Sequence, residues 1–229
     1  SQTYFSKLYN ETCHSTSGAI EETKIHYIEG CEISTKIERP LNIIEVGFGV
    51  GIGFLETLKA MSEKEFHFHS FEIDEELISL FAKANNILFE KKENIYIYKF
   101  SNGSLTIHLG NARETIKKIK GIKFHAIYQD AFSPKRNAIL WTTEWFKDLK
   151  SLSHDSCILS TYSASSSIRK SLIAAGWSLY SGKNFGSKRS STRARLYGDT
   201  EPEILDRLNR SHVEEITDEN YLDYTLENN

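Results

Sequence analysis

Apolar residues along this chain recur at two alternating spacings, one typical of buried strands and the other typical of helices. Four of the six residues at 41–46 are apolar, and the run ends in a cluster of glycines, which indicates a buried strand. Apolar residues at helical spacing follow at 54–61. The same alternation continues, with further strands expected at 66–71, 104–109, 124–129 and 157–162, and further helices at 77–82, 111–119, 141–152 and 168–175.

Five such alternations predict a doubly wound α/β fold with a mostly parallel sheet, because crossovers of this length join parallel strands and cover both faces with helices. Two weaker strands, at 177–180 and 193–197, are expected to form an antiparallel hairpin at the sheet edge. The first forty residues hold no clear helix and are expected to be a small β-rich extension. We therefore divide the chain into a β-rich cap at 1–40, a main domain at 41–198 and an appendage at 199–229.

Charge is unevenly distributed over the 229 residues, whose formal net charge is −3. Residues 199–229 carry ten acidic side chains and two arginines, a balance of −8, which leaves +5 for residues 1–198. A mildly basic body could contact the phosphates of a nucleic acid. A solvated surface with an acidic appendage explains the same charges equally well.

Composition argues against several classes of protein. No run of 18 apolar residues occurs, and the first residues lack the features of a secretion signal. The three cysteines are far apart and form no Cys-x-x-Cys pair, so a zinc site is not expected and a reducing cytoplasm fits best. His67 and His69 share one strand face without a third ligand at a suitable spacing. We therefore expect a cytoplasmic protein with no bound metal and no membrane partner.

The chemistry of such a fold is expected just after each strand, because doubly wound sheets bind ligands at the carboxyl ends of their strands. Glu45 and glycines at 47, 49, 51 and 53 follow the first strand and allow the backbone to approach a ligand closely. The dinucleotide fingerprint would need a glycine at 52 or 54, so it is absent. A merely tight strand-to-helix turn is the alternative interpretation.

Polar residues also follow the next three strands. Glu72, after the second strand, can accept both ribose hydroxyls of an adenosine. Asn111, after the third, can accept the adenine amino proton, can cap the next helix, or can do both. Asp130 ends the fourth strand, and Phe132 lies in the following loop, where it can stack on a flat substrate. Alternatively, Asp130 caps a turn and Phe132 fills the core.

The glycine turn resembles that of class I S-adenosylmethionine (SAM)-dependent methyltransferases, which have a Rossmann-like fold. Longer motifs are similar to the methyltransferase domain of the MnmC family, bacterial proteins that modify the wobble uridine of tRNA. The Asp-x-Phe-x-Pro-x-x-Asn run at 130–137, followed by Trp-Thr at 141–142, is much more specific than the glycine turn. The similarity also covers residues 4–6, 18–23, 47–55, 70–72, 161–163, 168–172 and 185–189.

The resemblance implies that SAM methylates the exocyclic amine of 5-aminomethyl-2-thiouridine in the tRNA anticodon stem-loop, giving 5-methylaminomethyl-2-thiouridine. The chain resembles the stand-alone form, so a separate enzyme would make the amine that an FAD-dependent oxidase domain provides in bifunctional members. Many methyltransferases have aspartate where Asn111 stands, so weaker SAM binding is expected. The resemblance assigns catalysis to Asp130 and Phe132, cofactor binding to Glu45, Gly47, Phe48, Gly49, Gly51, Glu72, Ile73, Asn111, Ala112 and Asp130, and substrate binding to Tyr4, Ser6, Glu22, Lys135, Arg136, Lys188 and Arg189.

Two other functions remain open from the sequence alone. An aminopropyltransferase of the spermidine-synthase type shares the glycine turn, the ribose carboxylate and the aspartate after strand four, but it needs further acidic residues to hold a polyamine. The sequence shows no such set. A non-catalytic SAM- or tRNA-binding module is the other alternative, and Asn111 gives it some support.

Overall fold

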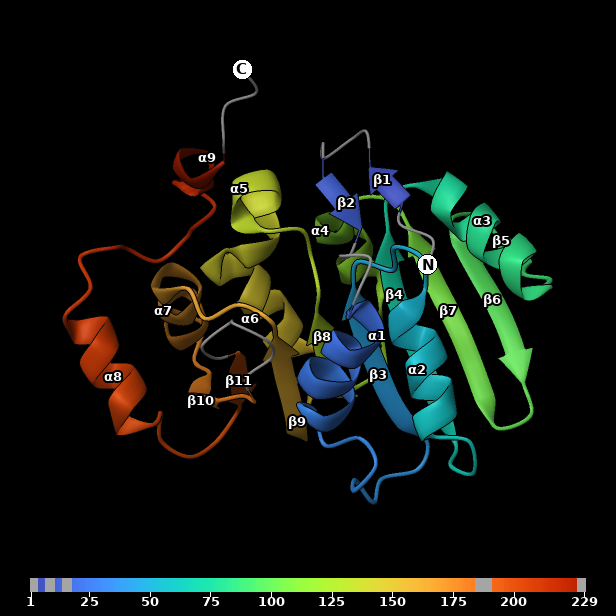
Figure 1. The fold of residues 1–229 in the computed structure, drawn as a ribbon, viewed down its shortest axis with the longest axis horizontal. Coiled ribbons are helices and arrows are strands. Elements are labelled where there is room, and N and C mark those ends of the chain that lie inside the picture. Colours follow the sequence, from blue (N-terminus) through green and yellow to red (C-terminus); the bar gives the residue numbers. More distant parts are fainter. Residues whose placement is uncertain (1–3, 7–10, 14–17, 184–190, 226–229) are drawn as a thin grey trace.

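The computed structural model describes residues 4–6, 11–13, 18–183 and 191–225, whose main feature is a nine-stranded sheet covered by helices on both faces (Figure 1). The strand order is β10-β11-β9-β8-β3-β4-β7-β6-β5. The strands are β3 (Leu41–Val46), β4 (Phe66–Glu72), β5 (Glu90–Lys92), β6 (Ile95–Phe100), β7 (Gly103–Leu109), β8 (Phe124–Gln129), β9 (Ser153–Thr161), β10 (Ser178–Ser181) and β11 (Thr192–Arg195).

The five central strands, from β9 to β7, run parallel, and the two outer strands at each edge are antiparallel to their inner neighbours. This confirms the predicted doubly wound, mostly parallel sheet and its antiparallel hairpin, β10–β11. The second hairpin, β5–β6, was not predicted. The helices are α2 (Ile52–Ala60), α3 (Glu75–Asn85), α4 (Ala112–Thr115), α5 (Pro134–Asn137), α6 (Thr143–Ser151), α7 (Ser166–Ala174), α8 (Pro202–Asn209) and α9 (Tyr221–Tyr224), with short 3-10 turns at η2 (Ile116–Lys118) and η3 (Ala138–Trp141).

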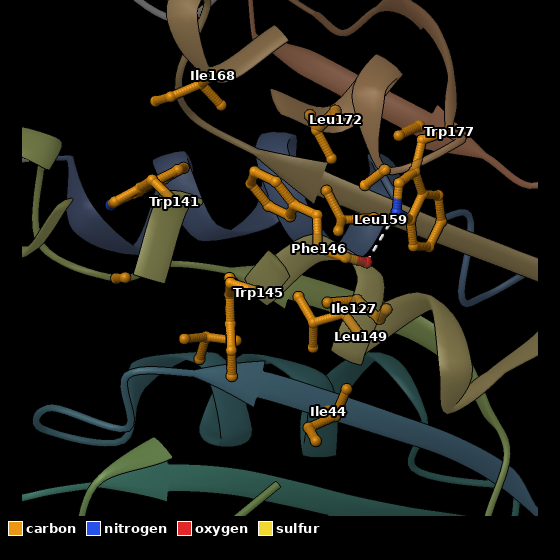
Figure 2. Packing of buried hydrophobic residues seen from close by; sticks show 14 of the residues in the cluster. Ile44, Ile127, Trp141, Trp145, Phe146, Leu149, Leu159, Ile168, Leu172 and Trp177 are labelled. Atoms are coloured by element: carbon orange, nitrogen blue, oxygen red, sulfur yellow. Dashed lines mark hydrogen bonds between the residues drawn. The ribbon is translucent and has the colours of Figure 1, made fainter. Parts of the chain in front are cut away.

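The core consists of two apolar clusters, one on each face of the sheet. On one face, α6 and α7 bury Trp145, Phe146 and Leu172, and the indole of Trp177 donates a hydrogen bond of 3.1 Å to the carbonyl oxygen of Phe146 (Figure 2). On the other face, α2 and α3 pack with many phenylalanine rings against β3 and β4. Burying one such side chain contributes roughly 1.5–3 kcal/mol, so this packing accounts for much of the stability of the sheet.

The N-terminal region contains a two-stranded hairpin, formed by β1 (Tyr4–Ser6) and β2 (Glu11–Cys13). It continues into α1 (Ala19–Thr23) and a π-helix, η1 (Lys24–Glu29). The expectation of no helix in the first forty residues was therefore wrong. Tyr27 and Ile28 of η1 join the core cluster of α2, which explains why this short segment is helical despite a weak local pattern.

The acidic C-terminal residues pack on the main sheet. Ile204 and Leu208 of α8 are buried in the cluster of α6 and α7, as is Ile216. Both backbone groups of Ile216 are hydrogen-bonded. Its N–H donates a hydrogen bond of 2.9 Å to Ser171 Oγ, and its carbonyl oxygen accepts one of 2.8 Å from the amide of Thr143. The polar face of this segment carries its negative charge, while its apolar face covers α7.

The two edges of the sheet are protected differently. At one edge, β5 is only three residues long, Glu-Lys-Lys, and all three are exposed. At the other edge, Thr200 and Glu201 hydrogen-bond to the outward backbone groups of β10: Thr200 Oγ1 accepts from the amide of Leu179, and the Glu201 carboxylate accepts from the amide of Ser181. The amide of Glu201 in turn donates 2.9 Å to the carbonyl of Leu179.

Within the described ranges, every helix is too short or too polar to cross a membrane.

Two buried histidines lie on β4 and β7. His69 Nδ1 is 3.1 Å from His108 Nε2, and the two rings stack at an interplanar angle of 18°. Burial lowers the pKa of His69 to about 3 and that of His108 to about 4, so both rings are neutral in the folded protein at neutral pH.

These histidines predict a loss of stability in mild acid. An unfolded histidine has a pKa near 6.5, so between about pH 6.5 and pH 4 the unfolded chain binds protons that the folded chain excludes. For His69, the free energy of unfolding should fall by about 2 kcal/mol from pH 7 to pH 5. Denaturant titrations at pH 7 and pH 5 measure this change. In His69→Phe the free energy of unfolding should fall by about 2 kcal/mol less than in the wild type. The exposed His212→Gln control should keep the wild-type pH dependence, and an equally steep fall in His69→Phe would contradict the prediction.

Candidate active site

A glycine turn joins β3 to α2 at the carboxyl edge of the sheet. Gly51 precedes α2 with φ 77°, a left-handed conformation that residues with a side chain rarely adopt. A Cβ at Gly51 would lie 2.4 Å from the ring of Phe81 and 3.0 Å from Phe48, while one at Gly47 would lie 3.0 Å from the carbonyl oxygen of Asp130. The side chain of Phe48 is buried, its amide donates 3.0 Å to the carbonyl oxygen of Phe71, and its carbonyl oxygen accepts 2.9 Å from the amide of Gly51. Phe48 therefore stabilises the turn, and a contact with the cofactor stays a prediction. The turn therefore lies against the loop that follows β8.

Glu72, at the end of β4, ties the second strand to this turn. Its carboxylate accepts hydrogen bonds from the amides of Gly49, Ile73 and Asp74, at 2.9, 2.8 and 2.9 Å. Burial raises the pKa of Glu72 to about 6, although the three amides oppose the shift. Each carboxylate oxygen has two lone-pair directions, and both directions of Oε1 are taken by the amides of Ile73 and Asp74. One direction remains on Oε2, so Glu72 can accept one ribose hydroxyl in this geometry, and not the two expected from the sequence. Beside it, the side chain of Ile73 is exposed and could cover an adenine.

Glu45 is a second buried carboxyl at the same edge. Its Oε2 accepts a 2.9 Å hydrogen bond from the hydroxyl of Ser70, and a Cβ at Gly53 would lie 1.8 Å from its Oε1. Burial raises the pKa of Glu45 well above its usual range, and the charges of Asp130 and Glu72 raise it further. Three carboxyl groups thus face one another across the turn.

This electrostatic arrangement fits SAM better than a phosphorylated ligand. The charges of Asp130 and Glu72 that raise the pKa of Glu45 would also repel the pyrophosphate of a dinucleotide, whereas a sulfonium and an ammonium group would be attracted to them. The glycine turn can hold the amino-acid part of the cofactor, and Glu72 its ribose. The residues present therefore fit the expected cofactor in both shape and charge.

Asp130 directly follows β8, the strand next to β3. The hydroxyl of Tyr27, from the π-helix η1, donates a 2.6 Å hydrogen bond to Asp130 Oδ1. Burial raises the pKa of Tyr27 well above its usual range, and the nearby charge of Asp130 adds to the shift, so the phenol is a donor throughout the neutral range. The carboxylate is thus held by a residue 103 positions earlier in the chain.

The loop after β8 carries the predicted substrate contacts. The carbonyl oxygen of Phe132 accepts a 2.7 Å hydrogen bond from the indole of Trp141, which fixes the backbone of the loop. Lys135 and Arg136 lie on the following turn, α5, where Lys135 is exposed and Arg136 half-buried. Helix α5 and the N-terminal hairpin both lie at the carboxyl edge of the parallel strands, at the top of the view in Figure 1.

Asn111 has the capping role that its position predicts. Its Oδ1 accepts a 3.0 Å hydrogen bond from the amide of Arg113 at the start of α4, and Ala112 behind it is buried. The guanidinium of Arg113 pairs with Asp218 of the C-terminal segment, and Asp218 Oδ1 accepts 2.7 Å from the hydroxyl of Thr142. An adenine contact by Asn111 stays a prediction.

The remaining predicted substrate residues lie in the N-terminal region or outside the described ranges. Tyr4 and Ser6 are on β1, and Glu22 is on α1, with its Oε1 3.8 Å from His26 Nε2. Lys188 and Arg189 lie outside the residues that the structure describes. Sequence reasoning missed Tyr27, because the run Lys-Ile-His-Tyr-Ile-Glu at 24–29 matches no motif and its contact is remote in sequence.

In the described part of the chain, one group of possible metal ligands lies at the opposite, amino edge of the sheet: Glu38, His125 and His154. His125 Nδ1 accepts a 3.0 Å hydrogen bond from the amide of Asn42, which leaves the proton of a neutral ring on Nε2. Neither nitrogen of His125 then has a lone pair for a metal. The group is better explained as a hydrogen-bonded cluster, in which Ser156 contacts both Glu38 and His154.

Comparisons with known proteins agree with this geometry. The sequence model of a family described as S-adenosyl-L-methionine-dependent methyltransferase matches residues 75–197. The chain is 28% identical over 220 residues to the tRNA 5-methylaminomethyl-2-thiouridine biosynthesis bifunctional protein MnmC of Paraburkholderia phymatum, covering 85% of this chain and 33% of that protein. It is 29% identical over 206 residues to the MnmC protein of Leptospira borgpetersenii, covering 79% and 31%. The chain thus spans about a third of the length of these relatives.

Two solved structures are similar in fold. The crystal structure of MnmC2 from Aquifex aeolicus superposes with a TM-score of 0.78 at 27% identity, covering 98% of this chain and 80% of that one. Human methyltransferase-like protein 13 in complex with SAH superposes with a TM-score of 0.53 at 14% identity, covering 82% and 85%, which supports the fold alone. Neither comparison favours an aminopropyltransferase or a non-catalytic module.

Proposed function

Because this chain belongs to the S-adenosyl-L-methionine-dependent methyltransferases, the family whose sequence model matches residues 75–197, we propose that it methylates the wobble uridine of tRNA. The acceptor is the exocyclic amine of 5-aminomethyl-2-thiouridine, and the product is 5-methylaminomethyl-2-thiouridine. The names of the MnmC relatives support this substrate. An activity of the oxidase class supplies the primary amine, and the reaction takes place in the cytoplasm, where tRNA is modified.

One observation carries the proposal: the glycine turn and the loop after β8 are in contact. A Cβ at Gly47 would lie only 3.0 Å from the carbonyl oxygen of Asp130. A cofactor held by the turn would therefore lie beside Asp130 and the loop with Phe132, where it would supply the methyl group. Lys135 and Arg136 follow within six residues, which suits a substrate whose reacting base is attached to phosphates.

SAM supplies a methyl group activated on a sulfonium. The amine nitrogen must approach it in line with its lone pair free, so alignment accounts for most of the acceleration, on the order of 7–11 kcal/mol at best. The carboxylate of Asp130 accepts a hydrogen bond from an N–H of the amine and so orients it. Once the new N–C bond forms, Asp130 accepts the proton that the nitrogen loses. Phe132 stacks on the uracil and holds it beside the carboxylate.

The anticodon loop is well suited to such a site. A base in a loop can leave the stack at little cost and enter a protein pocket, while the flanking phosphates stay on the surface. Lys135, Arg136, Lys188 and Arg189 are the candidates for these phosphate contacts. Tyr4, Ser6 and Glu22 are the candidates for substrate contacts from the N-terminal region. Binding of tRNA should therefore weaken steeply as the salt concentration rises.

The direct test is methyl transfer. The protein is incubated with labelled SAM and undermodified tRNA that carries 5-aminomethyluridine, with and without the 2-thio group, and the digested nucleosides are analysed by mass spectrometry. We expect the methylaminomethyl nucleoside to form, and its formation to stop in Asp130→Ala. Clear SAM binding without transfer to either tRNA would contradict the proposed substrate, and it would leave the methyltransferase family assignment intact.

The raised pKa of Glu72 predicts that SAM binding depends on pH. The ionised carboxylate is the form that accepts a ribose hydroxyl as well as the three amides, and burial raises the pKa of Glu72 to about 6. The Kd for SAM should therefore rise about 10-fold between pH 7 and pH 5. Calorimetric titrations across this range test the prediction. Glu72→Gln should bind more weakly at pH 7 and lose this part of the pH dependence, whereas the exposed Glu63→Gln should behave as the wild type. A pH-independent Kd in the wild type would contradict the role of Glu72.

A further inference from the structure

We propose that Tyr27 is a positioning residue for methyl transfer: its phenol fixes the direction of the Asp130 carboxylate, so that the carboxylate meets the substrate amine in one orientation. The inference rests on the proposed function of Asp130 and adds a residue from the N-terminal region to the catalytic apparatus. The contact on which it depends is the 2.6 Å hydrogen bond from the Tyr27 hydroxyl to Asp130 Oδ1.

The ring of Tyr27 is itself held in place. It is 2% exposed and stacks on the ring of Tyr128, with centroids 5.2 Å apart and an interplanar angle of 23°. Tyr128 lies on β8 two residues before Asp130, and its hydroxyl is 3.0 Å from that of Thr57 on α2. The phenol of Tyr27 therefore has little freedom to turn away from the carboxylate, and the hydrogen bond requires little further ordering.

The backbone that carries Tyr27 is unusual. It is a π-helix of six residues, Lys24–Glu29, and π-helical turns occur frequently at functional sites. The carbonyl oxygen of His26 accepts a hydrogen bond from the hydroxyl of Ser160 on β9. A Cβ at Gly30 would lie 1.8 Å from the carbonyl oxygen of His26 and 2.5 Å from Ser160 Oγ, so only a glycine fits between the π-helix and the strand at this point. Strand β9, which lies beside β8 in the sheet, thus holds η1 in place.

The chemical effect follows from where the charge lies. A hydrogen bond donated to a carboxylate favours its ionised form, which is the form that can accept the proton of the amine. Glu45 faces Asp130 from β3, and Glu22 of α1 and Tyr162 after β9 face Tyr27. The acids would favour the protonated form of Asp130. The phenol counteracts them, because it is a donor of high pKa that stays protonated throughout the assay range.

Tyr27→Phe is the test, because it removes the hydroxyl and keeps the ring that stacks on Tyr128. Tyr128→Phe is the matched control: it removes an equally buried hydroxyl from the same stack, but one that contacts α2 instead of Asp130. Rates of methyl transfer to aminomethyluridine tRNA are measured from pH 5 to pH 9 together with the Kd for SAM. We expect kcat of Tyr27→Phe to fall roughly 10-fold at pH 7, as for a lost hydrogen bond to a charged group.

We also expect the pH at which activity declines in acid to move upwards by about one unit in Tyr27→Phe and to stay in place in Tyr128→Phe. The Kd for SAM should be unchanged in both, which shows that both fold. A wild-type kcat and acid limb in Tyr27→Phe would overturn the inference while leaving the proposed function intact. Equal losses in both variants without a shifted limb would overturn it too, because they would indicate packing alone. A wild-type enzyme that binds SAM but transfers no methyl group would overturn the proposed function and the inference together.

Discussion

Asp130→Asn should lower kcat by a factor on the order of 10² to 10⁴, the usual range for a lost general base. Asparagine has the same shape as aspartate, and its Oδ1 can still accept the hydrogen bond from Tyr27, so the fold and the loop after β8 should be retained. It can no longer accept the proton that leaves the amine. The Kd for SAM should change little, because the glycine turn and Glu72 remain.

The measurement compares single-turnover methyl transfer with calorimetric binding of SAM in the same preparations. The exposed Asp155→Asn is the control for the loss of one negative charge, and it should keep the wild-type rate. Losses of equal size in kcat and in SAM affinity would contradict the proposed role, because they would mean that Asp130 serves the cofactor and not the acceptor amine.

The second large effect is expected at Gly51, where alanine should lower the free energy of unfolding by about 2–5 kcal/mol. About 1–2 kcal/mol comes from placing a side chain in the left-handed conformation at φ 77°. A further ~1–3 kcal/mol comes from overpacking, because the new Cβ would lie 2.4 Å from the ring of Phe81. The turn would have to shift to relieve this contact, so SAM binding should weaken as well.

Gly121 provides a matched control for this prediction. It has a similar φ of 71°, and a Cβ there would meet nothing within 4 Å. Gly121→Ala should therefore cost only about 1–2 kcal/mol, the part that comes from the backbone. Denaturant unfolding of both variants separates the two contributions. Equal losses at Gly51 and Gly121 would show that the contact with Phe81 relaxes freely, which would contradict the prediction.

The repeating parts of the fold could be predicted from the sequence, because each central strand is a short apolar run bounded by turns and each helix has its own spacing. The rule that ligands bind at the carboxyl ends of parallel strands then located Glu45, Glu72 and Asp130, and the structure brings all three together. Those predictions needed only local patterns and one rule of topology.

The parts that were missed depend on contacts between distant residues. The hydrogen bond between Tyr27 and Asp130 joins residues 103 positions apart, and no local pattern encodes it. The segment 90–100 continues the sheet in the antiparallel direction, which the expected alternation of strand and helix does not provide for. The acidic charge of residues 199–229 predicts a separate appendage, but Ile204 and Leu208 lie four residues apart, at helical spacing, and both are buried in the core.

The two outermost strands have a consequence for how this protein behaves at high concentration. An unpaired strand is a template on which another chain can add its own strand, and long sheets extend into aggregates in this way. Here one edge of the sheet is β5, whose exposed charged residues, Glu90, Lys91 and Lys92, would have to lose water before another strand could pair with it. At the other margin, Thr200 and Glu201 already occupy the outward amides of β10. The same acidic segment that covers α7 thus also closes the sheet against growth, and it contributes to keeping the molecules apart in solution.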